Sequence, residues 1–188
     1  MKNKFNLHSF KIINEIEKSL IEVDNTGLEE LVQQILLGQR IFIAGLGRTG
    51  LIMRCFAMRL MHLGFNVNIV GDVTSPSLNE KDLLLIGSGS GETSSLVSIS
   101  SIAKKIGAKI ILFTINRSSS LGQLASLKLC IPGVSPKLKN NNKHKSVQPM
   151  GSLFEQSLFL TLETLILILM EKKKINSELM YNNHSNLE

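Results

Sequence analysis

The chain lacks tryptophan, and Tyr181 is the only tyrosine among its 188 residues. Proteins that bind single-stranded nucleic acid stack bases on aromatic rings, and a nucleic-acid face also needs clustered basic residues. Here the basic excess, a formal net charge of +6, lies largely in two lysine-rich runs at 137–145 and 172–174. We interpret both runs as solvated surface that can attract an anionic substrate, and we expect no nucleic-acid partner.

Cysteine is also scarce, with only Cys55 and Cys130 present. Both stand within apolar or helical patterns, which predicts buried free thiols of a reducing compartment rather than a disulfide. No group of histidines and cysteines has the spacing of zinc ligands, so we expect no metal. The first residues, 1–4, lack the apolar core of a signal peptide. These features together predict a cytoplasmic protein.

Long uninterrupted apolar runs are absent as well. The segment 153–170 comes closest to a membrane span in length and composition. Five polar residues interrupt it, namely Glu155, Gln156, Thr161, Glu163 and Thr164. This pattern favours a buried or interface helix, and we expect no membrane partner.

Short apolar segments alternate with helical patterns through the middle of the chain. Strands are expected at 41–44, 67–70, 83–86, 110–113 and 127–131, and helices at 51–63, 94–106 and 119–125. The alternation predicts an α/β three-layer sandwich, in which helices flank a five-stranded, mostly parallel sheet of the flavodoxin-like kind. The length is sufficient for one well-buried domain over residues 1–188.

Other elements are expected on either side of this α/β core at 40–131. Two helices lie within 6–37; in the first, Leu7, Phe10, Ile13, Leu20 and Val23 recur at near-helical spacing. The second opens at Thr26, which forms a capping-box pattern with Glu29. A polar loop at 132–149, with asparagines at 140–142, precedes a long helix at 150–173 and a tail.

The most informative stretch is the segment 87–93, Gly-Ser-Gly-Ser-Gly-Glu-Thr, between the apolar run 83–86 and a helix beginning near Ser94. Glycines let the backbone approach a ligand, hydroxyls can donate, and a helix N-terminus favours an anion. The lysine of a nucleotide-binding P-loop is missing. The segment therefore predicts a cradle for the phosphate of a small sugar, formed by Ser88, Gly89, Ser90, Gly91, Glu92 and Thr93. The alternative is a flexible glycine–serine turn that binds no ligand.

A second glycine-rich loop, 45–50, follows the first expected strand and should lie at the same edge of the sheet. Its Arg48 is a natural partner for a phosphate or a hydroxyl-rich ligand. Its glycines also match a dinucleotide fingerprint, and Asp72 stands roughly where that motif needs an acid. The two leading helices and the serine-rich segment favour a sugar phosphate over a dinucleotide.

Three further residues carry candidate chemistry. Glu155 lies in the first turn of the last long helix, where a carboxylate either complements the helix dipole or serves as a general base. His62 ends the 51–63 helix, where it is either a cap charge or a catalytic group. His184 lies in a polar tail and by itself indicates no function.

Taken in order, four segments closely resemble the 6-phospho-3-hexuloisomerase family, a branch of the sugar isomerase (SIS) domains. They are the loop 45–50, the run 56–65 (Phe-Ala-Met-Arg-Leu-Met-His-Leu-Gly-Phe), the segment 88–93 and the run 148–155 (Gln-Pro-Met-Gly-Ser-Leu-Phe-Glu). The end of the chain, 184–188, is also similar. The resemblance implies reversible isomerisation of 3-hexulose 6-phosphate to fructose 6-phosphate in the ribulose monophosphate route, without a cofactor. It further implies a homotetramer with active sites near subunit contacts, working beside a hexulose-6-phosphate synthase.

The resemblance also implies residue roles. Glu155 would move a proton between C2 and C3 through an enediol, with Arg48 beside it, while Thr49 would touch the sugar. Ser88, Ser90 and Thr93 would hold the phosphate. His62 would assist proton transfer or ring opening, and His184 would come from a neighbouring subunit. The chain departs from the family at Gly87, where an aliphatic residue is common, and at Thr49, where serine is common.

Two other functions stay open at this point. One is a different aldose–ketose isomerase, such as one acting on arabinose 5-phosphate, although such enzymes commonly carry extra C-terminal modules for which the sequence up to 188 has no room. A phosphoheptose isomerase would favour metal ligands. The other is a sugar-phosphate sensor, which usually carries a helix-turn-helix at its N-terminus and has no need of Glu155. Whether the enzyme assimilates formaldehyde or makes pentoses is likewise open.

Overall fold

The structure is a computed structural model that describes residues 2–138 and 145–187. The expected asparagine run at 140–142 and most of the lysine-rich run at 137–145 lie outside these residues. The elements in chain order are α1 (Lys2–Ile21), α2 (Leu28–Leu37), β1 (Ile41–Gly45), α3 (Gly47–His62), β2 (Val67–Ile69), β3 (Leu83–Gly87), α4 (Ser94–Ile106), β4 (Lys109–Thr114), α5 (Ser120–Leu124), β5 (Leu127–Cys130), α6 (Ser152–Lys173) and α7 (Ser177–Tyr181).

The five strands form one sheet in the order β2-β1-β3-β4-β5, with every neighbouring pair parallel. All five residues of β3 are buried, because a parallel strand covered on both faces is a continuous apolar run. The chain passes from β1 outward to β2 and then returns to β3 on the other side of β1. This reversal creates a crevice beyond the carboxyl ends of β1 and β3, where ligands bind in such folds. The predicted fold class is confirmed.

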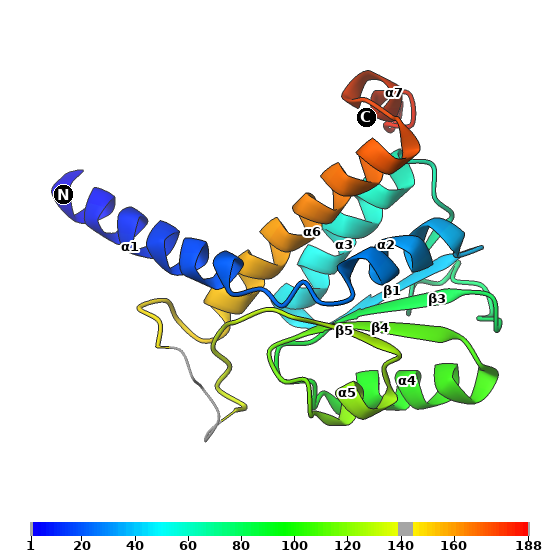
Figure 1. Cartoon of the computed structure of the whole chain (residues 1–188), viewed down its shortest axis with the longest axis horizontal. Coiled ribbons are helices and arrows are strands. Elements are labelled where there is room, and N and C mark those ends of the chain that lie inside the picture. The colour runs from blue at the N-terminus through cyan, green and yellow to red at the C-terminus, as the bar shows by residue number, and fades with distance from the viewer. Residues whose placement is uncertain (1, 139–144, 188) are drawn as a thin grey trace.

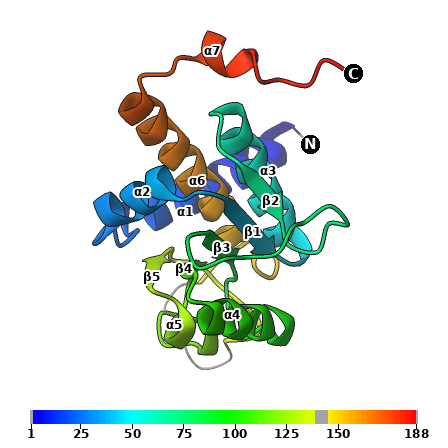
Figure 2. The ribbon, with the colours of Figure 1, turned by 90° about the vertical axis from the view of Figure 1, so that its right-hand side faces the viewer.

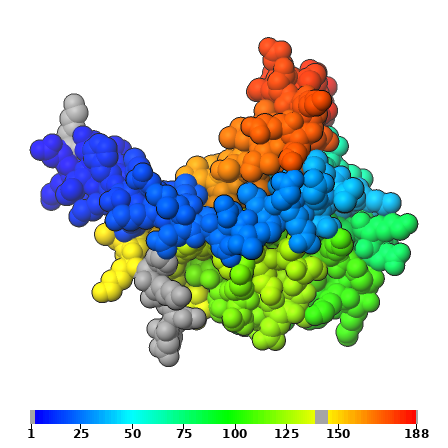
Figure 3. Space-filling view, viewed as in Figure 1, coloured from blue at the N-terminus to red at the C-terminus, as the bar shows by residue number. Residues whose placement is uncertain are grey.

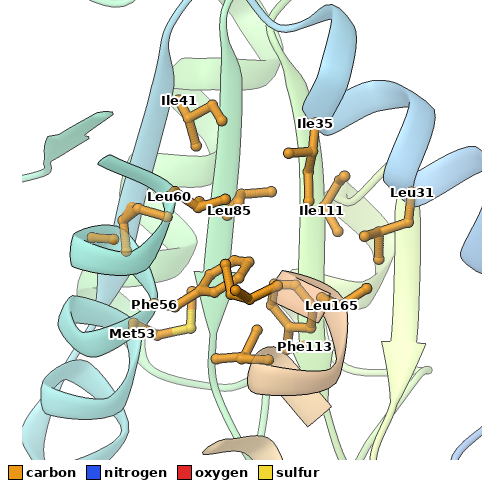
Figure 4. Close-up of a cluster of buried hydrophobic side chains, with 14 of the residues drawn as sticks. Leu31, Ile35, Ile41, Met53, Phe56, Leu60, Leu85, Ile111, Phe113 and Leu165 are labelled. Atoms are coloured by element: carbon orange, nitrogen blue, oxygen red, sulfur yellow. The ribbon is translucent and has the colours of Figure 1, made fainter. Parts of the chain in front are cut away.

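Helices cover both faces of the sheet. α4 and α5 lie on one face, and α2, α3 and α6 lie on the other (Figures 1 and 2). The larger core lies between the sheet and the latter group of helices (Figure 4). Its labelled side chains include Leu31, Ile35, Met53, Phe56, Leu60 and Leu165 from the helices and Ile41, Leu85, Ile111 and Phe113 from the strands. A second core, with Phe42, Leu84 and Leu112, lies under α4, because successive strand residues point to opposite faces.

Two local predictions are wrong. The capping box does not form: α2 begins at Leu28 after Gly27, whose φ of 84° is left-handed, and the Thr26 N–H donates to Asp24 Oδ1 instead. Asp24 itself forms a backbone bridge to Cys130 at the end of β5. The thiol of Cys55 is exposed rather than buried, since α3 turns its neighbours Met53 and Phe56 toward the core; Cys130 is half-buried. Both cysteines are free.

α1 projects from the body of the molecule as an arm (Figures 1 and 3). The predicted helix is present, but only its end is covered: Leu20 and Val23 are half-buried, while Leu7, Phe10 and Ile13 are 53%, 69% and 59% exposed. The apolar stripe at the start of α1 is therefore uncovered in a single chain.

α6 is the one described helix whose length and composition would allow it to cross a membrane. It runs beside α3 and also contacts α1 and α2 (Figure 1), and 50% of its apolar stretch is buried inside the fold. This burial fits the predicted core or interface helix. The short α7 after it was not predicted, because five residues with one buried side chain, Met180, leave no periodic signal.

Candidate active site

The two glycine-rich loops leave the sheet side by side, because Gly45 at the end of β1 pairs in register with Gly87 at the end of β3. Gly45 and Gly50 let the first turn of α3 approach β1 closely: a Cβ added at Gly50 would lie 2.6 Å from the Gly45 carbonyl oxygen. Close packing thus accounts for the spacing of these glycines. The carboxylate of Asp72, the acid of the dinucleotide alternative, pairs with Arg54 at 2.6 Å.

The central contact of the site joins Arg48 to Glu155. Arg48 Nε lies 2.5 Å from Glu155 Oε2, although the two residues are 107 positions apart. The side chain of Glu155 is 13% exposed and that of Arg48 is 67% exposed. The hydrogen bond to Glu155, together with the charge of that carboxylate, raises the pKa of Arg48. A sheltered carboxylate and an exposed cation therefore share the edge of the sheet.

Glycines also determine where the first turn of α6 lies. A Cβ added at Gly89 would lie 3.0 Å from Phe154 Cδ1, and one added at Gly133 would lie 2.6 Å from Phe154 Cβ. Phe154 is 2% exposed, so it is held between the serine-rich loop and the residues after β5. Because Glu155 follows Phe154 directly, this packing places the turn of α6 that carries Glu155 beside the serine-rich loop. Sequence reasoning did not single out Gly133, since an isolated glycine in a loop has no distinctive pattern.

Gly87 brings Thr49 to the same place. A Cβ at Gly87 would lie 2.7 Å from Met53 Cγ and 3.0 Å from Thr49 Cγ2. The buried Met53 side chain fills the space that a larger residue at position 87 would need. At Gly87, where the chain departs from the resembled family, the Met53 side chain therefore takes up the space. The missing side chain also lets Thr49 pack against the end of β3.

The serine-rich loop is shaped by its own hydroxyls. Ser88 Oγ accepts from the Gly91 N–H at 3.2 Å, and Ser90 Oγ accepts from the Glu92 N–H at 3.3 Å. A hydroxyl that accepts one hydrogen bond can still donate its own proton. Thr93 is the N-cap of α4 but forms no side-chain capping bond. Since the first N–H groups of a helix lack partners within it, this end of α4 combines free amides with three hydroxyls, an arrangement suited to a phosphate.

Glu92 is engaged elsewhere. Its carboxylate accepts hydrogen bonds from the Ser120 N–H at 2.9 Å and the Ser120 hydroxyl at 2.6 Å. These bonds hold the pKa of Glu92 below its ordinary value. Beside it, Gly91 has φ of 70° and lies against Ser119, so that a Cβ there would come within 2.0 Å of Ser119 Oγ. Glu92 and Gly91 therefore anchor the loop to α5, and the predicted contact between Glu92 and a substrate stays a prediction.

The two candidate histidines lie far from Arg48 within one chain. Arg48 is in the first turn of α3 and His62 is the last of its 16 residues, which separates them by about 20 Å at 1.5 Å per residue. The ring of His62 stacks on that of His184 with the centroids 5.4 Å apart, and the ring of Tyr181 stacks on that of His184 at 5.5 Å. Burial, with smaller effects from Arg59 and His184, lowers the pKa of His62. Within a single chain, His62, Tyr181 and His184 therefore form a cluster that is separate from the site of Arg48 and Glu155.

Within residues 2–138 and 145–187, no three histidine, cysteine, aspartate or glutamate side chains are grouped so that they could hold a metal ion. The donors that meet at the sheet edge are instead one guanidinium, one carboxylate, hydroxyls and backbone amides. This set suits proton transfer on a phosphorylated, hydroxyl-rich molecule.

Comparison with known proteins identifies the family. The SIS domain family matches residues 37–160. The chain is 48% identical to a 3-hexulose-6-phosphate isomerase of Bacillus subtilis, covering 95% of this chain and 96% of that protein. It is 41% identical to a 3-hexulose-6-phosphate isomerase of Mycobacterium gastri, covering 93% and 87% respectively.

A crystal structure supports the same assignment. A Methanococcus jannaschii protein with the inferred function of 3-hexulose-6-phosphate isomerase superposes with a TM-score of 0.81 at 33% identity, covering 96% of this chain and 99% of that one. The chain therefore belongs to the SIS domain family and, within it, to the branch of the 3-hexulose-6-phosphate isomerases.

Proposed function

We propose that this chain is an enzyme that interconverts 3-hexulose 6-phosphate and fructose 6-phosphate. The observation that carries the proposal is the contact between Arg48 and Glu155 beside the serine-rich loop, at the crevice where the strand order reverses. The similarity to named isomerases along almost the whole chain supports it. The arabinose 5-phosphate and sensor alternatives gain no comparable support.

The proposed reaction needs one base. In 3-hexulose 6-phosphate the carbonyl is at C3, and Glu155 removes the proton from C2. The electron pair moves into a C2–C3 double bond, which gives an enediolate with its charge on the C3 oxygen. The C2 hydroxyl gives its proton to the C3 oxygen, and the same carboxyl returns its own proton to C3, which leaves a carbonyl at C2 and a hydroxyl at C3. Arg48 and the loop hydroxyls would stabilise the charge as it develops.

The phosphate of the substrate would be bound at the end of α4. Ser88, Ser90 and Thr93 would donate their hydroxyl protons, and the first-turn amides would add N–H groups. The positive end of the helix dipole favours an anion of this kind. The same arrangement would orient the sugar so that C2 and C3 lie beside Glu155 and the C1 end lies near Thr49.

The enzyme would work as a homotetramer in which a neighbouring subunit contributes His62 and His184 to the site. Two observations support this assembly. His62, on which the His184 ring stacks, lies about 20 Å from Arg48 along α3 in the same chain, and the apolar stripe at the start of α1 is uncovered. Mixing Glu155→Gln with His62→Ala tests the sharing. If the two inactive proteins regain activity on mixing, each active site contains residues from two subunits. A mixture that stays inactive would contradict this sharing. A cytoplasmic location beside a hexulose-6-phosphate synthase would complete the role.

A coupled assay tests the reaction itself. A separate synthase would make hexulose 6-phosphate from ribulose 5-phosphate and formaldehyde, and fructose 6-phosphate would be measured through phosphoglucose isomerase and glucose-6-phosphate dehydrogenase. Product that depends on this protein supports the proposal. No product from folded protein with an active synthase refutes it, and arabinose 5-phosphate would then be the next substrate to test.

A further inference from the structure

The connection between β5 and α6 is tied to α1 at both of its ends. Ser19 Oγ donates to the Pro132 carbonyl oxygen at 2.7 Å. Pro132 directly precedes Gly133, which packs on Phe154. One helical turn earlier, Glu15 holds the other end of the connection. Since residues four apart share one face of a helix, this face of α1 contacts both described ends of the connection that leads to Glu155.

Glu15 accepts three hydrogen bonds from consecutive residues. They come from the Ser146 hydroxyl at 2.7 Å, the Val147 N–H at 2.7 Å and the Gln148 side-chain amide at 3.1 Å. Burial raises the pKa of the Glu15 carboxyl, but these hydrogen bonds outweigh it, and the pKa lies below its ordinary value. Hydrogen bonds to an ionised carboxylate are strong and directional. We call these three hydrogen bonds from residues 146–148 to Glu15 the Glu15 clamp.

The segment after this clamp contains a strained turn. Met150 has φ of 55°, a left-handed conformation that residues with a Cβ rarely adopt. Such a conformation persists only where the surrounding structure holds it. On one side of Met150 lies the Glu15 clamp. On the other, Gly151 accepts from the Glu155 N–H at 3.0 Å, and a Cβ at Gly151 would lie 3.4 Å from Glu155 Oε1.

We infer that Glu15 is a positioning residue for Glu155. The clamp on 146–148 holds the Met150 turn in its left-handed conformation, and the turn sets the first turn of α6 and the place of the Glu155 carboxylate. This inference rests on the proposed function for its kinetic consequence, because Glu155 is the proposed base. Displacement of a reacting group by about 1 Å can lower a rate by about a hundredfold, so a small movement of the turn is enough.

The first test compares Glu15→Ala with Glu17→Ala, which removes an exposed acid from the same helix. Glu15→Ala should lower kcat by about tenfold to a hundredfold, with KM for the sugar phosphate within about twofold, because the phosphate donors lie on other loops. Glu15→Gln keeps one acceptor oxygen and should fall between wild type and Glu15→Ala. Glu17→Ala should behave as wild type. An unchanged kcat in folded Glu15→Ala would overturn the inference.

The second test is amide hydrogen exchange, which needs no turnover. Glu15→Ala should speed exchange both at the Val147 N–H and at the Glu155 N–H, whereas a purely local clamp would change Val147 alone. Slow exchange at Glu155 in this variant would overturn the inference even if wild-type protein lacked isomerase activity. A wild type without turnover would refute the proposed function and leave the exchange result to decide the positioning role.

The third test uses the strained residue. In a Met150→Gly background the left-handed turn no longer needs to be held against a Cβ. The factor by which Glu15→Ala lowers kcat should therefore be several-fold smaller there than in the native background. An equal factor in both backgrounds would contradict the role assigned to the turn.

Discussion

Replacement of Glu155 by glutamine should separate catalysis from folding. The change preserves shape but removes the carboxylate that is proposed to carry the proton. Loss of a general base lowers turnover by at least about a hundredfold, which corresponds to about 2.7 kcal/mol in the activation free energy. Folding should change little, because the partner side chain of Arg48 is 67% exposed and solvent screens such a pair.

The coupled assay gives kcat and KM for Glu155→Gln, and urea denaturation gives its stability. Glu171→Gln is the matched control, since it replaces an exposed acid near the other end of α6. In deuterated water, wild type should place solvent deuterium on the carbon that receives the proton, and the variant should lose this label with its turnover. Turnover within about tenfold of wild type, in a variant that denatures normally, would refute the assignment of the base.

Three further predictions concern the loops and the distant histidine. Ser119 is the N-cap of α5, and its hydroxyl accepts from the Gly122 N–H. Gly91→Ala should lower the free energy of unfolding by about 2–4 kcal/mol, because the new Cβ is strained in a left-handed conformation and meets Ser119 Oγ at 2.0 Å, which disrupts that cap. A loss below about 1 kcal/mol in urea denaturation would contradict this. Ser90→Ala should raise KM more than it lowers kcat, and an unchanged KM would count against the phosphate site. The pKa of His62 is lowered from 6.5, mainly by burial and then by Arg59. His62 therefore takes up its proton at a higher pH in the unfolded chain than in the folded one. As a result, the free energy of unfolding falls as the pH drops below about 6.5 toward the folded pKa. His62→Gln should flatten that slope in pH-dependent unfolding, and an unaltered slope would contradict the assignment.

Helices and strands were predictable where they depend mainly on their own residues. The apolar runs at 41–44, 83–86 and 110–113 correspond to β1, β3 and β4, because strands buried on both faces need apolar residues throughout. The predicted helix at 94–106 coincides with α4. The Thr26–Glu29 capping box failed because Asp24 and its bridge to β5 decide where α2 begins, and that contact is not local.

The candidate site was predictable only in outline. By itself the sequence determined that two glycine-rich loops follow strands of a parallel sheet and that Glu155 opens a long helix, since hydrophobic periodicity and turn chemistry act over a few residues. The tertiary structure alone decided that Arg48 meets Glu155 across 107 positions, that Glu92 turns to α5, and that Glu15 clamps the segment before α6. These contacts depend on how helices and strands pack against one another, and the local pattern of residues does not encode that packing.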